Sequence, residues 1–205
     1  VEVYTRNWYN AGWNVVLRPK SANLAEKSAV ACEKACANNK IGYDQYQRNN
    51  LYKEAQKVGW DISKIKTACE CDCSSLMHTC AIIGGAHLTY GSNGLVTFNM
   101  VNAFVKSGDY EKLTGSKYCA QDKYLKRGDI LVKESGHTAM VLSNGSAAGA
   151  TTTATATTTA KKSVEDVAKE VLNGLWGNGD SRKAKLEAAG YNYSEVQDMV
   201  NALAS

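Results

Sequence analysis

The spacing of apolar and polar positions in the first half of the chain predicts a series of helices. Apolar residues recur three and four positions apart in four separate runs, which is the period of one buried helix face. Ser21 stands shortly after Pro19 and suits a helix cap, while Gly84 and Gly85 end the third run. The four runs are residues 21–39, 49–59, 73–84 and 97–108.

Near residue 130 the helical spacing gives way to apolar runs that have the length of β-strands. Two apolar runs, Ile130–Lys133 and His137–Leu142, are joined by the short polar stretch "ESG" and followed by "SNG". Helices that come first and strands that come last are typical of an α+β domain with an antiparallel sheet. We therefore expect helices packed on a small antiparallel sheet.

Residues 147–162 are expected to be a linker. The stretch "AAGATTTATATTTA" within it contains almost only alanine and threonine, with no charge and no large apolar side chain. Such a sequence cannot bury enough apolar surface to offset the conformational entropy lost on folding. The linker separates a first domain, residues 1–146, from a second domain, residues 163–205.

The second domain is predicted to be a small three-helix bundle. Ser163 and Asp180 are candidate caps of its first two helices, and Ser194 with Gln197 forms a capping box before the third. Several apolar residues of the third helix fall on one face. These residues are Val196, Met199, Val200 and Leu203.

Composition narrows the class of protein. The hydrophobic fraction of 44% permits a packed core, and the net charge of +4 without a Lys/Arg block does not indicate nucleic acid as a partner. No apolar run approaches the roughly 18–20 residues of a membrane span, and the first ten residues lack a signal-peptide pattern. The seven cysteines are an odd number, which favours synthesis in a reducing compartment over a secreted disulfide scaffold.

Four of the seven cysteines fall within "TACECDCSSLMHTC", residues 67–80. A zinc site would use Cys69, Cys71 and Cys73 with Cys80 or His78, but C-x-C-x-C is poor spacing for a tetrahedron, and no metal is expected. A disulfide from Cys69 or Cys71 to a distant cysteine stays open. Most of the cysteines are expected to be small buried apolar residues.

Cys73 is the candidate nucleophile. It opens an apolar helix behind Asp72, so its sulfur faces free N–H groups and the positive end of the helix dipole. Both are expected to lower the pKa of the thiol, and the same N–H groups can bind a developing oxyanion. His137, which opens a strand after a glycine, is the candidate base of a Cys–His pair. His78, on the same helix, and His87, in a loop, are weaker candidates.

The motifs "DCSSL", "LKRGDILV" and "GHTAMVLSNG", in that order, resemble the papain-like cysteine hydrolases of bacterial cell walls, the NlpC and CHAP group. The resemblance covers about residues 40–146. It implies that the Cys73 thiolate attacks an amide of peptidoglycan, with His137 as base and then as acid. "IGYDQYQRN" resembles the approach to the nucleophile in that group, which implies that Tyr43 hydrogen-bonds near the thiolate; a half-buried packing tyrosine is the alternative reading.

The third polar residue that usually orients the histidine in this group is not apparent. Asn144 lies seven residues after His137, which is roughly 23 Å along an extended strand. We therefore expect a catalytic dyad and leave the third member open.

The stretch "WGNGDSRKAKLEAAGYNYSEVQDMVNALA" resembles the CW-seven repeat, a cell-wall-binding module of phage endolysins. This resemblance covers essentially all of residues 163–205. It implies that Trp176, Tyr191 and Tyr193 stack on sugars while Arg182 reaches a carboxylate or carbonyl. The alternative is that Trp176 and Tyr193 form the core of the small bundle.

Together the two resemblances imply a modular phage endolysin with a papain-like catalytic domain. The expected reaction is hydrolysis of an amide bond in the stem peptide of peptidoglycan, with an endopeptidase slightly favoured over an N-acetylmuramoyl-L-alanine amidase. A catalytically inactive wall-binding protein is the alternative of another class. The expected partner is bacterial peptidoglycan, without a cofactor. The expected site of synthesis is the cytoplasm of the bacterial host, and the site of action is the wall; the oligomeric state is left open.

Overall fold

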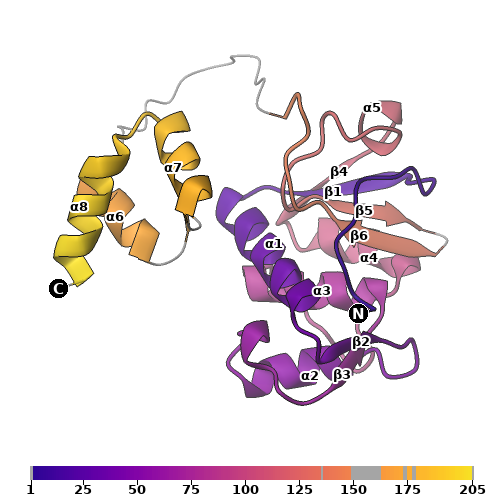
Figure 1. The fold of residues 1–205 in the computed structure, drawn as a ribbon. Helices are drawn as coiled ribbons and strands as arrows, with labels where there is room; N and C mark the ends of the chain where they lie inside the picture. The colour runs from indigo at the N-terminus through magenta and orange to yellow at the C-terminus, as the bar shows by residue number, and fades with distance from the viewer. Residues whose placement is uncertain (1, 135, 149–162, 173–174, 177–178, 205) are drawn as a thin grey trace. The chain divides into compact units, whose positions relative to one another are not determined.

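The fold was analysed in a computed structural model, which describes residues 2–134, 136–148, 163–172, 175–176 and 179–204 (Figure 1). The chain divides into two compact units, Val1–Thr151 and Thr152–Ser205. The first unit mixes helices with a small antiparallel sheet, so the α+β class predicted from the sequence is confirmed. Among the described residues, no helix combines the length and the apolar character that crossing a membrane requires.

The main sheet has four antiparallel strands in the order β4-β1-β5-β6. The two strands predicted near residue 130 are present as β5 and β6, although β6 ends at Met140. The expectation that strands come only last is wrong, because β1 precedes all helices and pairs with both β4 and β5. The strands are β1 (Val15–Pro19), β4 (Tyr110–Leu113), β5 (Ile130–Lys133) and β6 (His137–Met140).

A second, two-stranded sheet pairs β2 (Ile41–Tyr43) with β3 (Cys69–Cys71) in parallel. Tyr43 lies opposite Cys71 in this register. The end of β2 is therefore close to the start of the helix that follows β3, which begins at Cys73. Both strands have only three residues, too short to show a period in the sequence.

The four helices predicted in the first unit are confirmed. Ser21 accepts a hydrogen bond from the backbone N–H of Leu24 and caps the first helix, and Gly85, with φ of 100°, ends the third. Two shorter helical segments also occur, Ile62–Lys64 (η1) and Ser116–Cys119 (α5). The four longer helices are α1 (Ala22–Ala37), α2 (Asn50–Lys57), α3 (Cys73–Gly84) and α4 (Thr97–Lys106).

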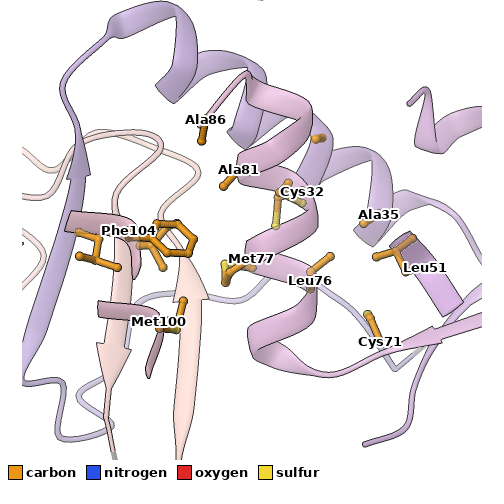
Figure 2. Packing of buried hydrophobic residues seen from close by; sticks show 14 of the residues in the cluster. Cys32, Ala35, Leu51, Cys71, Leu76, Met77, Ala81, Ala86, Met100 and Phe104 are labelled. Carbon is orange, nitrogen blue, oxygen red and sulfur yellow. The ribbon is translucent and has the colours of Figure 1, made fainter. Parts of the chain in front are cut away.

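The core of the first unit surrounds α3, which is buried along most of its length. Figure 2 shows Met77 and Ala81 of α3 directed toward the side of Phe104, while Cys32 of α1 lies between the two helices. Apolar contact on several sides fixes the axis of α3 and therefore the position of its first residue, Cys73.

The turn before β5 is held by close packing and an ion pair. Gly128 has φ of 89°, and a Cβ there would lie 2.6 Å from the Cα of Ala25, so only glycine fits. The fully buried Asp129 carboxylate accepts hydrogen bonds from Arg18 of β1 at 2.6 and 2.9 Å. The glycine and aspartate of the "GD" motif therefore anchor the start of β5.

The second unit contains three helices that share a small apolar cluster, α6 (Val164–Leu172), α7 (Gly179–Ala188) and α8 (Tyr193–Ala204). Ser163 accepts a hydrogen bond from the backbone N–H of Asp166, as its predicted role as a cap requires.

Three details of the second unit differ from the sequence prediction. The third helix is capped by Asn192, whose side chain accepts from the N–H groups of Ser194 and Glu195, so the predicted cap Ser194 lies inside the first turn. The second helix begins at Gly179, which places Asp180 within it rather than before it. Leu203 is 41% exposed and does not share the burial of Val196 and Val200.

Phe104 and Phe98 offer a matched test of the core, since both lie on α4. Phe104 is fully buried and packs edge to face on Tyr110, whereas Phe98 is 83% exposed. We expect Phe104→Ala to lower the free energy of unfolding by about 3–5 kcal/mol and Phe98→Ala by less than about 0.5 kcal/mol. Denaturant titration of both variants checks this, and equal losses would contradict the assigned packing.

Candidate active site

The N-terminus of α3 is closed by reciprocal hydrogen bonds. The Asp72 carboxylate accepts from the backbone N–H of Ser75 at 2.7 Å, and the Ser75 hydroxyl accepts from the backbone N–H of Asp72 at 2.9 Å. This capping box confirms Asp72 as the N-cap and makes Cys73 the first helical residue.

Arg48 holds the capping carboxylate in place. Its guanidinium binds Asp72 through Nε at 2.6 Å and Nη2 at 3.2 Å, and also donates to the Ser74 hydroxyl at 2.8 Å. The same group donates to the backbone carbonyls of Asn93 and Leu95. Burial raises the pKa of Asp72, but the hydrogen bonds from Arg48 and Ser75 outweigh it and leave the pKa below its ordinary value.

Arg48 was not identified from the sequence. It precedes Asp72 by 24 residues and lies in the stretch "IGYDQYQRN", which was interpreted only through Tyr43. A lone arginine at that distance gives no local signal of its partner.

The Cys73 sulfur lies between α3, β6 and Tyr43. Its pKa is raised, above all by burial, and the neighbouring Asp72 charge raises it further. Hydrogen bonds from the Tyr43 side chain and from the backbones of Thr138 and Ser74 lower the pKa without reversing the shift. The expected net lowering of this pKa is therefore wrong. The Ser74 backbone at the start of α3 does lower the pKa, but burial outweighs that effect.

His137 begins β6, directly before Thr138, whose backbone reaches the Cys73 sulfur. Its ring stacks on Trp13 with the centroids 5.6 Å apart and an interplanar angle of 25°. Burial lowers the pKa of His137, and the positive charges of Arg6 and Lys133 lower it further. The imidazole is consequently neutral at pH 7, the form that accepts a proton. Trp13 was also not identified from the sequence.

One cavity of about 880 Å³ brings the predicted residues together. Cys73, His137 and Tyr43 all line it, although they come from three separate elements. Its remaining walls come from the segment before β1, from α1 and from the chain that follows β6. The arrangement places a thiol and a neutral imidazole in a partly apolar pocket large enough for a peptide or sugar unit.

The other two histidines lie outside this cavity, whereas Asn144 lines it but does not bind the His137 ring. His78 is fully buried, stacks on Tyr90, and burial lowers its pKa to about 4. His87 is exposed and pairs with Asp109 at 3.0 Å. The side-chain oxygen of Asn144 accepts from the backbone N–H of Arg127. Among the described residues, no hydrogen bond to the His137 ring supplies the third catalytic member that the sequence left open.

All seven cysteines are free thiols, and five of them are buried. Cys36 and Cys73 are the two that are partly exposed, and both line the cavity. The pKa of Cys36 is raised, first by its hydrogen bond with Cys32 and then by burial. Most of the cysteines thus pack as apolar residues, as the sequence analysis predicted.

The four residues of the second unit that were predicted to bind the wall, Trp176, Arg182, Tyr191 and Tyr193, are partly buried. Trp176 and Tyr193 pack against the apolar cluster of the unit, and the Trp176 indole N–H donates to Glu170 at 3.1 Å. Arg182 donates to the Gln197 side chain at 3.3 Å. Both aromatic rings therefore take part in packing, the alternative that the sequence analysis had weighed.

The mixed domain and the helical repeat define a two-part protein. Residues 1–148 match the sequence profile of the endolysin-like domain, and residues 165–203 match that of the CW_7 repeat. The first match covers more than half of the chain, and the chain belongs to the endolysin-like domain family.

The chain is also similar to "Lysozyme" of Streptococcus phage Cp-7, with 52% identity over 42 residues. The matched stretch is 20% of this chain, and the chain spans only 12% of the length of that relative. No solved structure matches the chain.

The Arg48–Asp72 pair can be tested by removing one partner. We expect Arg48→Met to lower the free energy of unfolding at pH 7 by about 3–5 kcal/mol, because it leaves a buried carboxylate without its counter-charge. The difference from wild type should shrink as the pH falls, because the unpaired Asp72 carboxylate of the variant is protonated first. The wild-type ion pair is lost only below about pH 4, where Asp72, whose pKa is lowered, takes up its proton. Denaturant titration across pH measures both effects.

The control is Lys64→Met, which removes an exposed lysine 3.5 Å from Asp61 and should change stability by less than about 1 kcal/mol. If the two variants were equally stable, Arg48 would have no special role at the start of α3.

Proposed function

We propose that the first domain is a cysteine-dependent peptidoglycan hydrolase with a papain-like fold and a Cys73–His137 dyad. The proposal rests chiefly on one observation: the Cys73 sulfur, at the first turn of α3, meets the backbone of the residue next to His137, and both side chains line one cavity. Membership of the endolysin-like domain family supports peptidoglycan as the substrate.

At rest the proposed dyad would be a neutral thiol and a neutral imidazole that line the same cavity. His137 takes the proton from Cys73 as the sulfur attacks the carbonyl carbon of the scissile amide. The imidazolium then gives that proton to the departing amine, and a thioester remains on Cys73. Water attacks the thioester with His137 again as base, which releases a carboxylate product and restores the thiol.

The oxyanion of the tetrahedral intermediate needs hydrogen-bond donors near the sulfur. Asp72 occupies the N–H of Ser75, so the remaining N–H groups of the first turn of α3, at Cys73 and Ser74, are the proposed donors. Tyr43, which hydrogen-bonds the sulfur at rest, would hold the thiol in its cavity-facing position.

We propose that residues 163–205 anchor the enzyme to the wall and that residues 147–162 link the anchor to the hydrolase, residues 1–146. The match to the CW_7 repeat supports the anchor. Trp176, Arg182 and Tyr193 remain the proposed wall-binding residues, each through the part of its side chain that packing leaves open. The protein would be made in the cytoplasm of a phage-infected or lysogenic host and act at the wall.

The bond cut in the stem peptide is proposed to be a peptide bond, with the amide between muramic acid and the peptide as the alternative. A catalytically inactive wall-binding protein is the alternative of another class. That alternative is favoured by the lack of an acceptor that orients the His137 ring among the described residues.

Digestion of purified peptidoglycan tests the reaction. The wild type and Cys36→Ala should release fragments, whereas Cys73→Ala and His137→Ala should lose at least about a thousandfold in rate. Cys36 is the matched control because it is a second partly exposed thiol of the same cavity.

Mass spectrometry of the released ends names the bond. New peptide termini mean an endopeptidase, and free lactyl groups mean an amidase. New reducing sugar ends, or undiminished cutting by Cys73→Ala, would contradict the cysteine mechanism. Binding without any cutting would leave the inactive wall-binding protein.

The acid limb of kcat/KM should lie below pH 6.5, because the pKa of His137 is lowered and the imidazole stays neutral in mild acid. Lys133 lies directly opposite His137 in the β5–β6 register. Lys133→Gln should therefore raise the pKa of His137 and move the acid limb to higher pH, while Lys112→Gln on β4 should not. An unmoved acid limb in Lys133→Gln would mean that another group controls it.

A further inference from the structure

One wall of the cavity is made by the segment Glu2–Tyr9, which precedes β1. The segment is held in place along its length. Val3 is buried in the main core, and Trp8 and Tyr9 pack against the cluster around Trp13. The carboxylate of Glu2 accepts a hydrogen bond from the backbone N–H of Tyr43 at 2.6 Å. The wall is therefore a fixed surface facing the same space as the proposed dyad.

Arg6 is the cation of this wall. Its guanidinium carbon lies 3.9 Å from the centre of the Tyr9 ring, a stacking contact that limits where the charge can go. The charge is close enough to the start of β6 to act on His137. Arg6 thus stands on the rim of the reaction site, with its planar group supported from one side.

Arg6 differs from the other arginines of the first unit in its partners. Arg18, Arg48 and Arg127 each bind at least one carboxylate of the chain. Among the residues that the structure describes, no carboxylate lies within ion-pair distance of Arg6. A guanidinium has five N–H donors arranged so that two of them can bind one carboxylate. At Arg6 no carboxylate of the described residues takes up these donors.

Three acidic residues line the cavity, Glu2, Glu33 and Asp122, and in the described part of the chain none forms an ion pair with Arg6. Glu2 is engaged by Tyr43, and Glu33 binds Arg127 at 2.5 and 2.9 Å. The indole N–H of Trp8, two residues from Arg6 on the same wall, is buried and likewise meets no acceptor in the described part of the chain. The Trp8 N–H is too deeply buried to reach a ligand, whereas Arg6 is exposed on the cavity wall, so its donors are open to an acceptor that a ligand brings.

We propose that Arg6, supported by Tyr9, forms a subsite for a free carboxylate of the substrate, so that the cavity selects acidic stem peptides over their amidated forms. The inference rests on the proposed function, since it places the carboxylate on the same peptide whose amide reaches Cys73. A planar guanidinium takes a carboxylate through two parallel hydrogen bonds, whereas a carboxamide offers one neutral acceptor and repels the fork with its own donors.

The test uses two synthetic muramyl peptides that differ at one position, a free carboxyl in one and a carboxamide in the other. Binding of each to the full chain carrying Cys73→Ala is measured by calorimetry, so that no ligand is consumed. The carboxylate ligand should bind roughly tenfold more tightly than the amide. Adding Arg6→Gln should bring the two affinities to within about twofold, and Arg6→Lys should retain part of the preference.

The matched control is Lys106→Gln, which removes one positive charge from α4, outside the cavity, and should leave the preference unchanged. Equal affinities for the two ligands in the Cys73→Ala protein, or a preference that survives Arg6→Gln, would overturn the proposal. Far-ultraviolet circular dichroism of each variant excludes misfolding as the cause of a lost preference.

Cutting of whole walls by the wild type, measured in parallel, separates the two proposals. If walls are cut and Arg6→Gln keeps the preference, the subsite is wrong and the hydrolase stands. If walls are not cut while the carboxylate preference depends on Arg6, the subsite stands and the hydrolase is wrong.

Discussion

The ion pair between Arg48 and Asp72 is the constraint on which the candidate site depends. The Asp72 side chain is 10% exposed and caps α3, so it needs a counter-charge to remain an anion away from water. Arg48 supplies that charge and also binds the carbonyls of Asn93 and Leu95. Because one guanidinium joins the cap, the first turn and a distant loop, the position of Cys73 follows from a residue outside its own motif.

Burial acts on both members of the proposed dyad, in opposite directions. It raises the pKa of the Cys73 thiol and lowers the pKa of the His137 imidazole, so the neutral forms of both are favoured at rest. Charge would then form only as the thiol proton moves to the imidazole during attack. Trp13 covers one face of the imidazole and Tyr43 contacts the sulfur, which keeps the pair in partly apolar surroundings.

Local patterns predicted local structure well, and failed where two local signals competed. The caps at Ser21, Asp72 and Ser163 each depend on a backbone N–H three residues away, and each was found from sequence. At the last helix, two residues two positions apart, Asn192 and Ser194, could serve as the cap, and the earlier one does so. Which of two nearby residues caps a helix depends on the residue at which the helix begins, and the capping propensities of the residue types do not specify that position.

The amino-acid sequence by itself determined the helices of the first unit, the cysteine at a helix start and the order of the motifs, because these depend on residues close together in the chain. Only the tertiary structure decided that β1 is an inner strand, that Arg48 neutralises Asp72, and that the segment with Arg6 and Trp13 forms a wall beside His137. Strand pairing, ion pairing and desolvation depend on contacts between segments that are far apart in the sequence. Spacing along the chain does not record which segments these are, so the raised pKa of Cys73 could be read only from the folded protein.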